Sequence, residues 1–183
     1  ANKIITTGEG GMVVTNDEET AERARSYRNL CFKPGRRFYH TELGENFRMT
    51  NLQAAVGVAQ LEQIDRFIEI KKTMAKKYSK GLAGISEIKL PVEMPGVKNV
   101  YWMYAIELAE ESGFDAGRLA AHLAEQGIAT RPFFLGLHEQ PVFHTMGLFV
   151  DERYPVAERI ARQGLYLPSG LTITGEQISK VVV

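Results

Sequence analysis

Lys3 is the residue of this chain whose side chain and position most clearly suggest a catalytic role. It follows Asn2 and opens two short β-branched runs, at residues 3–7 and 12–15, that flank the glycine cluster GEGG. A lysine amine can form a Schiff base with a carbonyl compound, and a freed amine can then act as an acid or base. The ordinary interpretation, from composition alone, is a solvated amine near a chain end.

Other candidate sites have weaker patterns. The glycines at residues 8–11 lack the Lys-Ser/Thr pair and the following helix of a phosphate-binding P-loop, so we expect a tight turn there. The four histidines are scattered and the single cysteine, Cys31, completes no ligand set, so the sequence predicts no metal site. Ser169, in LPSG, lacks the flanking glycines of a nucleophile elbow, which argues against a hydrolase.

The composition argues against nucleic acid and membranes as partners of this protein. Because 22 basic and 22 acidic side chains cancel, no broad electrostatic footprint for nucleic acid or an anionic membrane is visible. No apolar run reaches the roughly 18 residues of a membrane helix. With 183 residues, 44% of them hydrophobic, the chain can bury the core of one or two compact units. The lone Cys31 cannot form an internal disulfide, which is compatible with the cytoplasm, where we expect the protein to work.

The elements that would position Lys3 begin with a hairpin, predicted from the runs at residues 3–7 and 12–15. Asn16 has the capping signature of a helix that runs to about Arg28. Residues 30–48 have no clear periodicity, and we expect a long loop there. Such loops in compact domains are usually functional or mobile.

The second half of the chain begins at another capping pair, Thr50 with Gln53. The apolar spacing that follows predicts one long helix ending near residues 81–84. Beyond that helix, strands and helices alternate, which is typical of an α/β unit. We predict strands at residues 85–91, 100–108 and 128–130, and helices at residues 115–127, 154–163 and from 174 onward. Asp115 and the pair Thr174 with Gln177 have the capping signatures of the helices that begin there.

Four blocks of the sequence carry a resemblance to a known family. In chain order they are NKIITTGEGGMVVTND, GENFRMTNLQAAVGVAQLEQID, GIATRPFFLGLHEQPVF and LYLPSGLTITGEQI. They resemble the DegT/DnrJ/EryC1/StrS family of pyridoxal-phosphate-dependent sugar aminotransferases, and within it most resemble the members that make GDP-perosamine from a 4-keto-6-deoxy sugar nucleotide. The resemblance implies the C-terminal part of a fold-type I PLP-dependent aminotransferase, an α/β fold. Residues 1–48 would be the remnant of the PLP-binding large domain, and residues 49–183 the long helix and the C-terminal small α/β domain.

The resemblance also implies roles for five residues. Lys3 would be the catalytic residue and would carry pyridoxal 5′-phosphate as a Schiff base. Asn46, in the G-x-N-x-R stretch, would reach the cofactor phosphate of the neighbouring subunit, and Arg48 would add charge to the same anion. Arg131 and His138 would line the cleft for the nucleotide sugar. The ordinary alternatives are a turn or cap residue for Asn46 and an ion pair with an acidic neighbour for Arg48.

The implied function is transamination of a nucleotide-linked 4-keto-6-deoxy sugar, with glutamate as the amino donor. The implied assembly is a homodimer with shared active sites, serving lipopolysaccharide O-antigen biosynthesis. Because full-length members place further cofactor contacts before the lysine, we expect this chain by itself to be inactive and to associate through apolar surface. Two alternatives remain. One is a sugar dehydratase or isomerase of the same fold, disfavoured because such dehydratases carry histidine where Lys3 stands, and the other is a non-enzymatic regulatory or scaffold domain.

Overall fold

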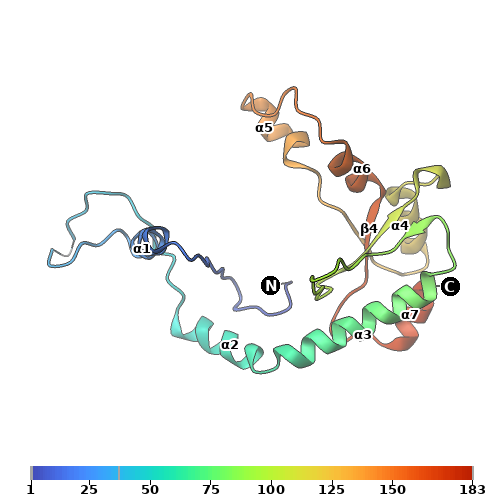
Figure 1. Ribbon diagram of the computed structural model, residues 1–183, viewed down its shortest axis with the longest axis horizontal. Coiled ribbons are helices and arrows are strands. Elements are labelled where there is room, and N and C mark those ends of the chain that lie inside the picture. Colours follow the sequence, from blue (N-terminus) through green and yellow to red (C-terminus); the bar gives the residue numbers. More distant parts are fainter. Residues whose placement is uncertain (1, 37, 183) are drawn as a thin grey trace. The chain divides into compact units, whose positions relative to one another are not determined.

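The computed structural model describes residues 2–36 and 38–182 of the chain. The chain divides into two compact units, which we call unit 1 (Ala1–Asp65) and unit 2 (Arg66–Val183). Figure 1 shows the order of their helices and strands. None of the described helices combines the length and the apolar character that a membrane span requires.

Unit 1 contains the helices α1 (Glu18–Tyr27) and α2 (Asn51–Leu61) with the segments that connect them. α1 starts one residue later than predicted, because the Asp17 carboxylate, not the Asn16 amide, accepts the capping hydrogen bond from the Thr20 N–H at 2.7 Å. The long loop predicted before α2 is confirmed. Its two ends meet in an isolated antiparallel bridge between Asn29 and Asn46.

The capping box predicted at Thr50 and Gln53 is confirmed, but the single long helix is wrong. α2 ends at Leu61 and α3 (Ile64–Leu82) follows after a short turn. The N–H of Gln63 bonds to the carbonyl of Gln60 at 3.1 Å, one residue short of the α-helical partner. This tightening closes α2, whose residues are all at least partly exposed.

The hairpin predicted over residues 3–7 and 12–15 is also wrong, since neither run forms a strand. The side chain of Gln60, on α2, takes the place of a partner strand. Its Oε1 accepts from the Thr6 N–H at 2.9 Å and its Nε2 donates to the Thr6 carbonyl at 2.8 Å. Further along, Gln53 Nε2 donates to the Glu9 carbonyl at 3.2 Å. Two glutamines of α2 therefore hold the first segment of the chain against that helix.

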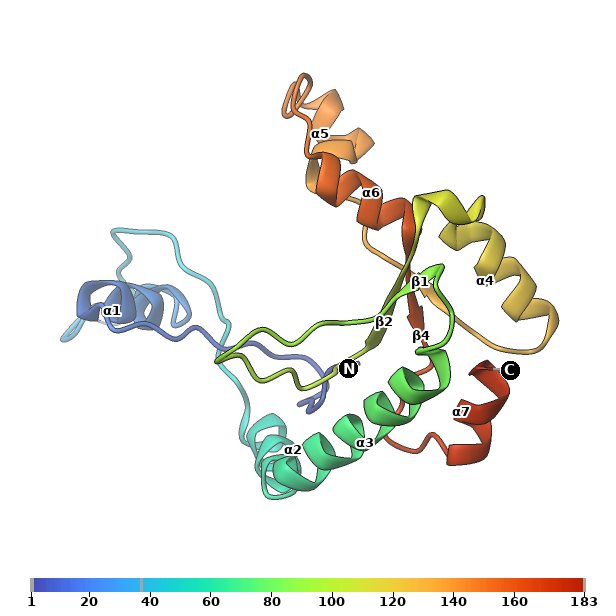
Figure 2. The ribbon, with the colours of Figure 1, turned by 45° about the vertical axis from the view of Figure 1, so that its right-hand side comes forward.

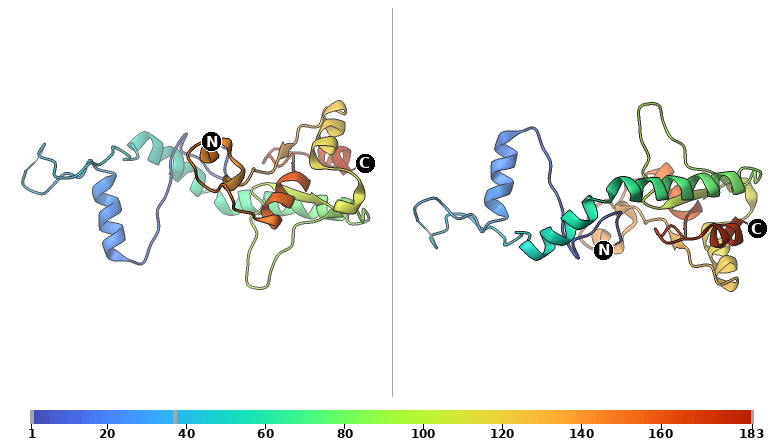
Figure 3. Two further views of the ribbon diagram at one scale, coloured as in Figure 1. Left: turned by 90° about the horizontal axis from the view of Figure 1, so that it is seen from above. Right: turned by 90° about the horizontal axis from the view of Figure 1, so that it is seen from below.

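Unit 2 is built on a four-stranded antiparallel sheet in the order β1-β2-β4-β3. Figure 2 labels β1, β2 and β4 of this sheet. The strands are β1 (Ile88–Lys89), β2 (Tyr104–Leu108), β3 (Arg131–Pro132) and β4 (Gly164–Leu167). β2 begins at Tyr104 rather than at Val100, because Tyr101 has the left-handed φ of 48° that a strand does not accept. The segment before it extends as an open loop (Figure 3). The strand predicted at residues 128–130 is wrong, since β3 lies at Arg131–Pro132. Pro132, which lacks an N–H, is tolerated there because β3 is an edge strand.

Helices of unit 2 begin largely where their capping signals predict. Asp115 caps α4 (Ala116–Glu125) through the Arg118 N–H at 2.8 Å. Thr174 and Gln177 exchange hydrogen bonds at the start of α7 (Gly175–Val182). Between β3 and β4 lie a 3-10 turn (Leu137–Glu139), α5 (Pro141–Thr145) and α6 (Pro155–Gln163).

The core of unit 2 joins one face of α3 to the central strands. Tyr78 of α3 stacks on Tyr104 of β2 with ring centroids 4.9 Å apart, and its hydroxyl donates to the Pro168 carbonyl at 2.9 Å. Lys71, also on α3 and only 5% exposed, donates to the carbonyls of Trp102 and Ser169. Burial lowers the pKa of the Lys71 amine. The polar groups at the centre of unit 2 therefore fasten α3 to the segments beside β2 and β4.

Candidate cofactor and substrate site

Lys3 lies in the exposed first segment of unit 1. Three residues further on, the Gln60 side chain holds both backbone groups of Thr6. Ile4 and Ile5, between them, are partly buried. Lys3 therefore lies three residues from an anchored point of the backbone, which limits how far its backbone can move from α2.

Asn46 and Arg48 form a pair that presents hydrogen-bond donors. Arg48 Nε donates to Asn46 Oδ1 at 3.1 Å, so the acceptor atom of the amide is bonded to the guanidinium. The amide N–H groups and the terminal guanidinium nitrogens take no part in this bond. No carboxylate is paired with Arg48 in the part of the chain that the structure describes. Both side chains are exposed, and a cluster of donors with a positive charge is suited to an oxyanion such as phosphate.

The backbone beside Asn46 is held by a tight junction at the base of the loop. Leu30 and Cys31 have left-handed φ values of 60° and 50°. The Leu30 N–H donates to the Glu45 carbonyl at 3.1 Å, and Gly44 packs against the backbone of Cys31. Cys31 is 0% exposed and donates through Sγ to the Leu43 carbonyl at 3.3 Å. We call this contact the Cys31–Gly44 junction.

Arg131, on β3 of unit 2, lies in an aromatic cluster. Its guanidinium carbon is 4.9 Å from the centroid of the Phe134 ring, a cation–π geometry. Phe133 stacks on Tyr166 of β4 at 4.4 Å, and Phe134 is 59% exposed. Among the described residues no carboxylate pairs with Arg131, whereas Arg159 is bonded to Glu107. The Arg131 donors and the Phe134 ring thus form a partly open surface.

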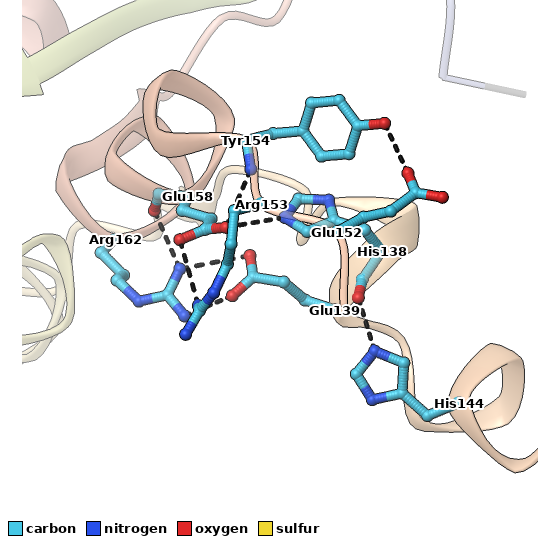
Figure 4. A network of polar contacts seen from close by, with 8 residues as sticks. All are labelled: His138, Glu139, His144, Glu152, Arg153, Tyr154, Glu158 and Arg162. Carbon is cyan, nitrogen blue, oxygen red and sulfur yellow. Dashed lines mark hydrogen bonds and ion pairs between the residues drawn. The ribbon is translucent and has the colours of Figure 1, made fainter. Parts of the chain in front are cut away.

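His138 is buried instead, at 7% exposed. Its Nε2 lies 3.2 Å from Glu158 Oε1, and its ring meets the Tyr154 ring edge-on at 4.8 Å. The His138 carbonyl also takes part, since His144 Nε2 lies 2.6 Å from it (Figure 4). His138 therefore ties together the 3-10 turn, α5 and the start of α6.

Charged groups surround His138 in the same network (Figure 4). Glu158 accepts from the Tyr154 N–H at 3.0 Å and lies 3.5 Å from Arg153 Nη1. The Tyr154 hydrogen bond is the main reason why the pKa of the Glu158 carboxyl is lowered, with His138 and Arg153 adding to it. Arg162, hydrogen-bonded to Glu139, likewise lowers the pKa of the Glu139 carboxyl.

The five predicted residues therefore fall into two groups. Lys3, Asn46 and Arg48 belong to unit 1, and Arg131 and His138 belong to unit 2. The residues predicted from the motifs of the sequence do not include those that hold these side chains in place, which are Gln60, Gly44, Cys31 and Glu158. Gly44 is the glycine of the G-x-N-x-R stretch, so that motif could have indicated it. No motif could have indicated Gln60, because a polar residue on an exposed helix carries no local signal.

Comparison with known proteins places this geometry in context. The family described as "DegT/DnrJ/EryC1/StrS aminotransferase family" matches residues 1–183. The chain is 36% identical over 177 residues to a GDP-perosamine synthase of Escherichia coli O157:H7, covering 97% of this chain and 46% of that protein. It is 34% identical over 183 residues to the putative pyridoxal phosphate-dependent aminotransferase EpsN of Bacillus subtilis (strain 168), covering 99% of this chain and 46% of the relative.

A solved structure is similar as well. The aminotransferase TlmJ of Streptoalloteichus hindustanus superposes with a TM-score of 0.84 at 25% identity, covering 98% of this chain and 47% of that chain. The chain therefore spans about half the length of the relatives that it matches.

Proposed function

We propose a function from the premise that this chain belongs to the DegT/DnrJ/EryC1/StrS aminotransferase family, whose match extends over residues 1–183. Its fold is the α/β fold of part of a fold-type I aminotransferase. The proposed function is pyridoxal-phosphate-dependent transamination of a nucleotide-linked keto sugar by the protein that carries this chain. The observation that carries the proposal is the donor pair of Asn46 and Arg48, inside that match together with Lys3.

The residues present fit pyridoxal 5′-phosphate. The phosphate needs donors and positive charge, which Asn46 and Arg48 offer once Oδ1 of the amide is bonded to Nε of the guanidinium. The aldehyde needs a primary amine, which Lys3 offers. When bound, the cofactor would supply an electron sink for the substrate carbon. Lys3 would then take and return a proton at that carbon, and the Gln60–Thr6 hydrogen bonds would hold its backbone.

For the substrate we propose a GDP-linked 4-keto-6-deoxy sugar, with glutamate as the amino donor. The printed name of the Escherichia coli relative, a GDP-perosamine synthase, supports this choice. Arg131 would bind the nucleotide sugar directly, because its guanidinium is paired with an aromatic ring and not with a carboxylate. His138, which faces Glu158 inside unit 2, would act on the same cleft by holding the segment that follows Arg131.

We further propose a cytoplasmic homodimer with shared active sites, which serves O-antigen synthesis. Exposed apolar side chains in unit 1 support a covering partner, among them Met12, Val14, Phe47 and Leu52. The division into a cofactor-binding portion over residues 1–48 and a small domain over residues 49–183 stays a prediction.

Borohydride reduction in the presence of pyridoxal 5′-phosphate tests the cofactor proposal on the whole protein that carries this chain. Mass spectrometry should find the reduced adduct on the peptide that contains Lys3, and Lys3→Ala should abolish it. Lys76→Ala, at an exposed lysine of α3, is the matched control and should keep the adduct. A protein without the adduct, with no heat of pyridoxal phosphate binding, would favour the scaffold alternative.

Product analysis separates the two enzymatic readings. Incubation with GDP-4-keto-6-deoxymannose and glutamate should yield an amino sugar and 2-oxoglutarate. A product that has lost water and gained no nitrogen would instead support the dehydratase.

A further inference from the structure

Two consecutive residues at the base of the loop in unit 1 adopt a conformation that their side chains disfavour. Leu30 and Cys31 both lie in the left-handed region, with φ of 60° and 50°. Non-glycine residues rarely enter that region and stay there only when the surroundings require it. The Cys31 N–H returns to the Ser26 carbonyl at 2.9 Å, which turns the chain sharply after α1. Cys31 is also the one buried residue among those that the structure describes in unit 1.

Gly44 explains why this turn fits. A Cβ at Gly44 would lie 2.6 Å from the Cys31 nitrogen, 2.7 Å from the Leu30 carbonyl carbon and 2.8 Å from Cys31 Sγ. Two of these three atoms belong to the backbone, so they cannot move away as the end of a flexible side chain can. Only glycine at position 44 allows this end of the loop to approach the backbone of Cys31 so closely.

The close approach fixes the backbone on both sides of Asn46. The Glu45 N–H donates to the Tyr27 carbonyl at 2.8 Å, and the Phe47 N–H donates to the Arg28 carbonyl at 3.0 Å. Asn46 itself is bridged to Asn29. An exposed asparagine is thereby held by bonded neighbours on both sides.

We propose that the Cys31–Gly44 junction positions Asn46 and Arg48 so that their donors converge on the cofactor phosphate. This inference rests on the proposed function. Cys31 and Gly44 are positioning residues: they touch neither the cofactor nor the reacting atoms, and they act through the backbone of residues 45–47. The left-handed pair at Leu30 and Cys31 is then the structural requirement for presenting the two donors at the base of the loop.

Equilibrium binding of pyridoxal 5′-phosphate and of pyridoxal, which lacks the phosphate, tests this in the whole protein. Gly44→Ala should weaken pyridoxal phosphate about tenfold, as expected for loss of a charge-assisted hydrogen bond, and should leave pyridoxal binding unchanged. Asn46→Ala should show the same selective loss. Gly84→Ala, where an added Cβ meets nothing within 4 Å, is the matched control and should bind both ligands like the unmodified protein.

The reactivity of the Cys31 thiol reports on the junction independently of the cofactor. An alkylating reagent, followed by mass spectrometry on the peptide that contains Cys31, should label the unmodified protein slowly, because Cys31 is buried, and should label Gly44→Ala faster. If Gly44→Ala does not fold, Cys31→Ala replaces it in the binding experiment. That change removes the sulfur and its bond to Leu43 without adding an atom, and it should weaken pyridoxal phosphate selectively but less.

The possible failures can be told apart. Unchanged pyridoxal phosphate binding in the junction variants, or an equal loss for both ligands, overturns the positioning role and leaves the proposed function intact. An unmodified protein that binds pyridoxal phosphate no better than pyridoxal overturns the phosphate site, and the positioning role falls with it.

Discussion

At Asn46, a single hydrogen bond decides what the side chain can bind. Arg48 Nε is bonded to the amide oxygen, which leaves the amide N–H groups as the donors that Asn46 can offer to an anion. Asn46→Asp would replace those donors with a second acceptor and a negative charge. We expect binding of pyridoxal phosphate to weaken by more than about tenfold, because the carboxylate repels the phosphate.

The same chemical change at Asn51 provides the control for Asn46→Asp. Asn51 is exposed in the first turn of α2, where a negative charge is favourable. Asn51→Asp should therefore leave the titration of the protein with pyridoxal phosphate unchanged. Equal affinities for the two aspartate variants would contradict the assignment of Asn46 to the phosphate.

Tyr78 provides a residue-scale test of the core of unit 2. Burial, with a smaller contribution from Tyr104, raises the pKa of Tyr78 from 10.0 to about 12. Because the folded state favours the neutral phenol, the stabilisation is complete below pH 10 and is lost as the pH rises toward 12. Tyr78→Phe should lower the free energy of unfolding by about 1 kcal/mol at neutral pH, through loss of the bond to Pro168.

Urea unfolding of both proteins between pH 9 and 11.5 checks this prediction. The stability of the unmodified protein should fall more steeply above pH 10 than that of Tyr78→Phe. Parallel curves would show that Tyr78 is not the group whose ionisation opposes folding.

At the scale of elements, the segment from the 3-10 turn to α6 is held by charge more than by apolar packing. Glu158 joins Tyr154, His138 and Arg153, while Arg162 binds Glu139. The pKa of Glu158 lies below its ordinary 4.5, so its stabilising effect is present above pH 4.5 and is lost as the pH falls through the folded value.

NMR titration of the Tyr154 amide signal measures this effect directly. In the unmodified protein the signal should shift with a midpoint below 4.5, the ordinary value. In Glu158→Gln the shift should disappear, because the group that receives the Tyr154 N–H no longer ionises. A midpoint at or above the ordinary value would contradict the lowered pKa.

How well an element was predicted from sequence depends on how local its cause is. The caps at Thr50, Asp115 and Thr174 involve partners three residues away, and all three were predicted. The hairpin failed because Gln60, 54 residues from Thr6, bonds to the backbone that the hairpin would have paired. No property of the first segment indicates this partner.

In the candidate site, the motif residues could be predicted from the sequence, but the residues that support them could not. Lys3 and Asn46 stand in motifs that a family resemblance can find. Their supports are set by distant contacts, such as Gly44 against Cys31 or Glu158 against His138. Periodicity describes which face of a helix is buried, but it does not say which side chain will reach a given backbone group.

At the scale of the molecule, the two units differ in how much they bury. Unit 2 has a core of buried residues on α3, β2 and β4, such as Met74, Ile106 and Leu165. In the described part of unit 1 only Cys31 is buried. Local stability follows buried apolar contacts. We therefore expect the two units to open with different free energies.

Hydrogen exchange on the 183-residue chain, read by mass spectrometry, checks this expectation. Amides of α1 and α2 should exchange well before those of α3, β2 and β4. Similar protection in both units would contradict it, and would point to burial of unit 1 by association of the chain with itself.

The segment around Trp102, which is hydrogen-bonded to Lys71, determines which part of the chain tryptophan fluorescence can report on. Trp102 is the single tryptophan of the chain, and its carbonyl accepts a hydrogen bond from the Lys71 amine within unit 2. Intrinsic fluorescence therefore reports on the surroundings of that indole and contains no tryptophan signal from unit 1. A melting curve of the tryptophan fluorescence, excited at wavelengths that tyrosine does not absorb, would follow unit 2 alone, whereas circular dichroism at 222 nm would also record the loss of α1 and α2. A gap between the two curves would reveal separate melting of unit 1.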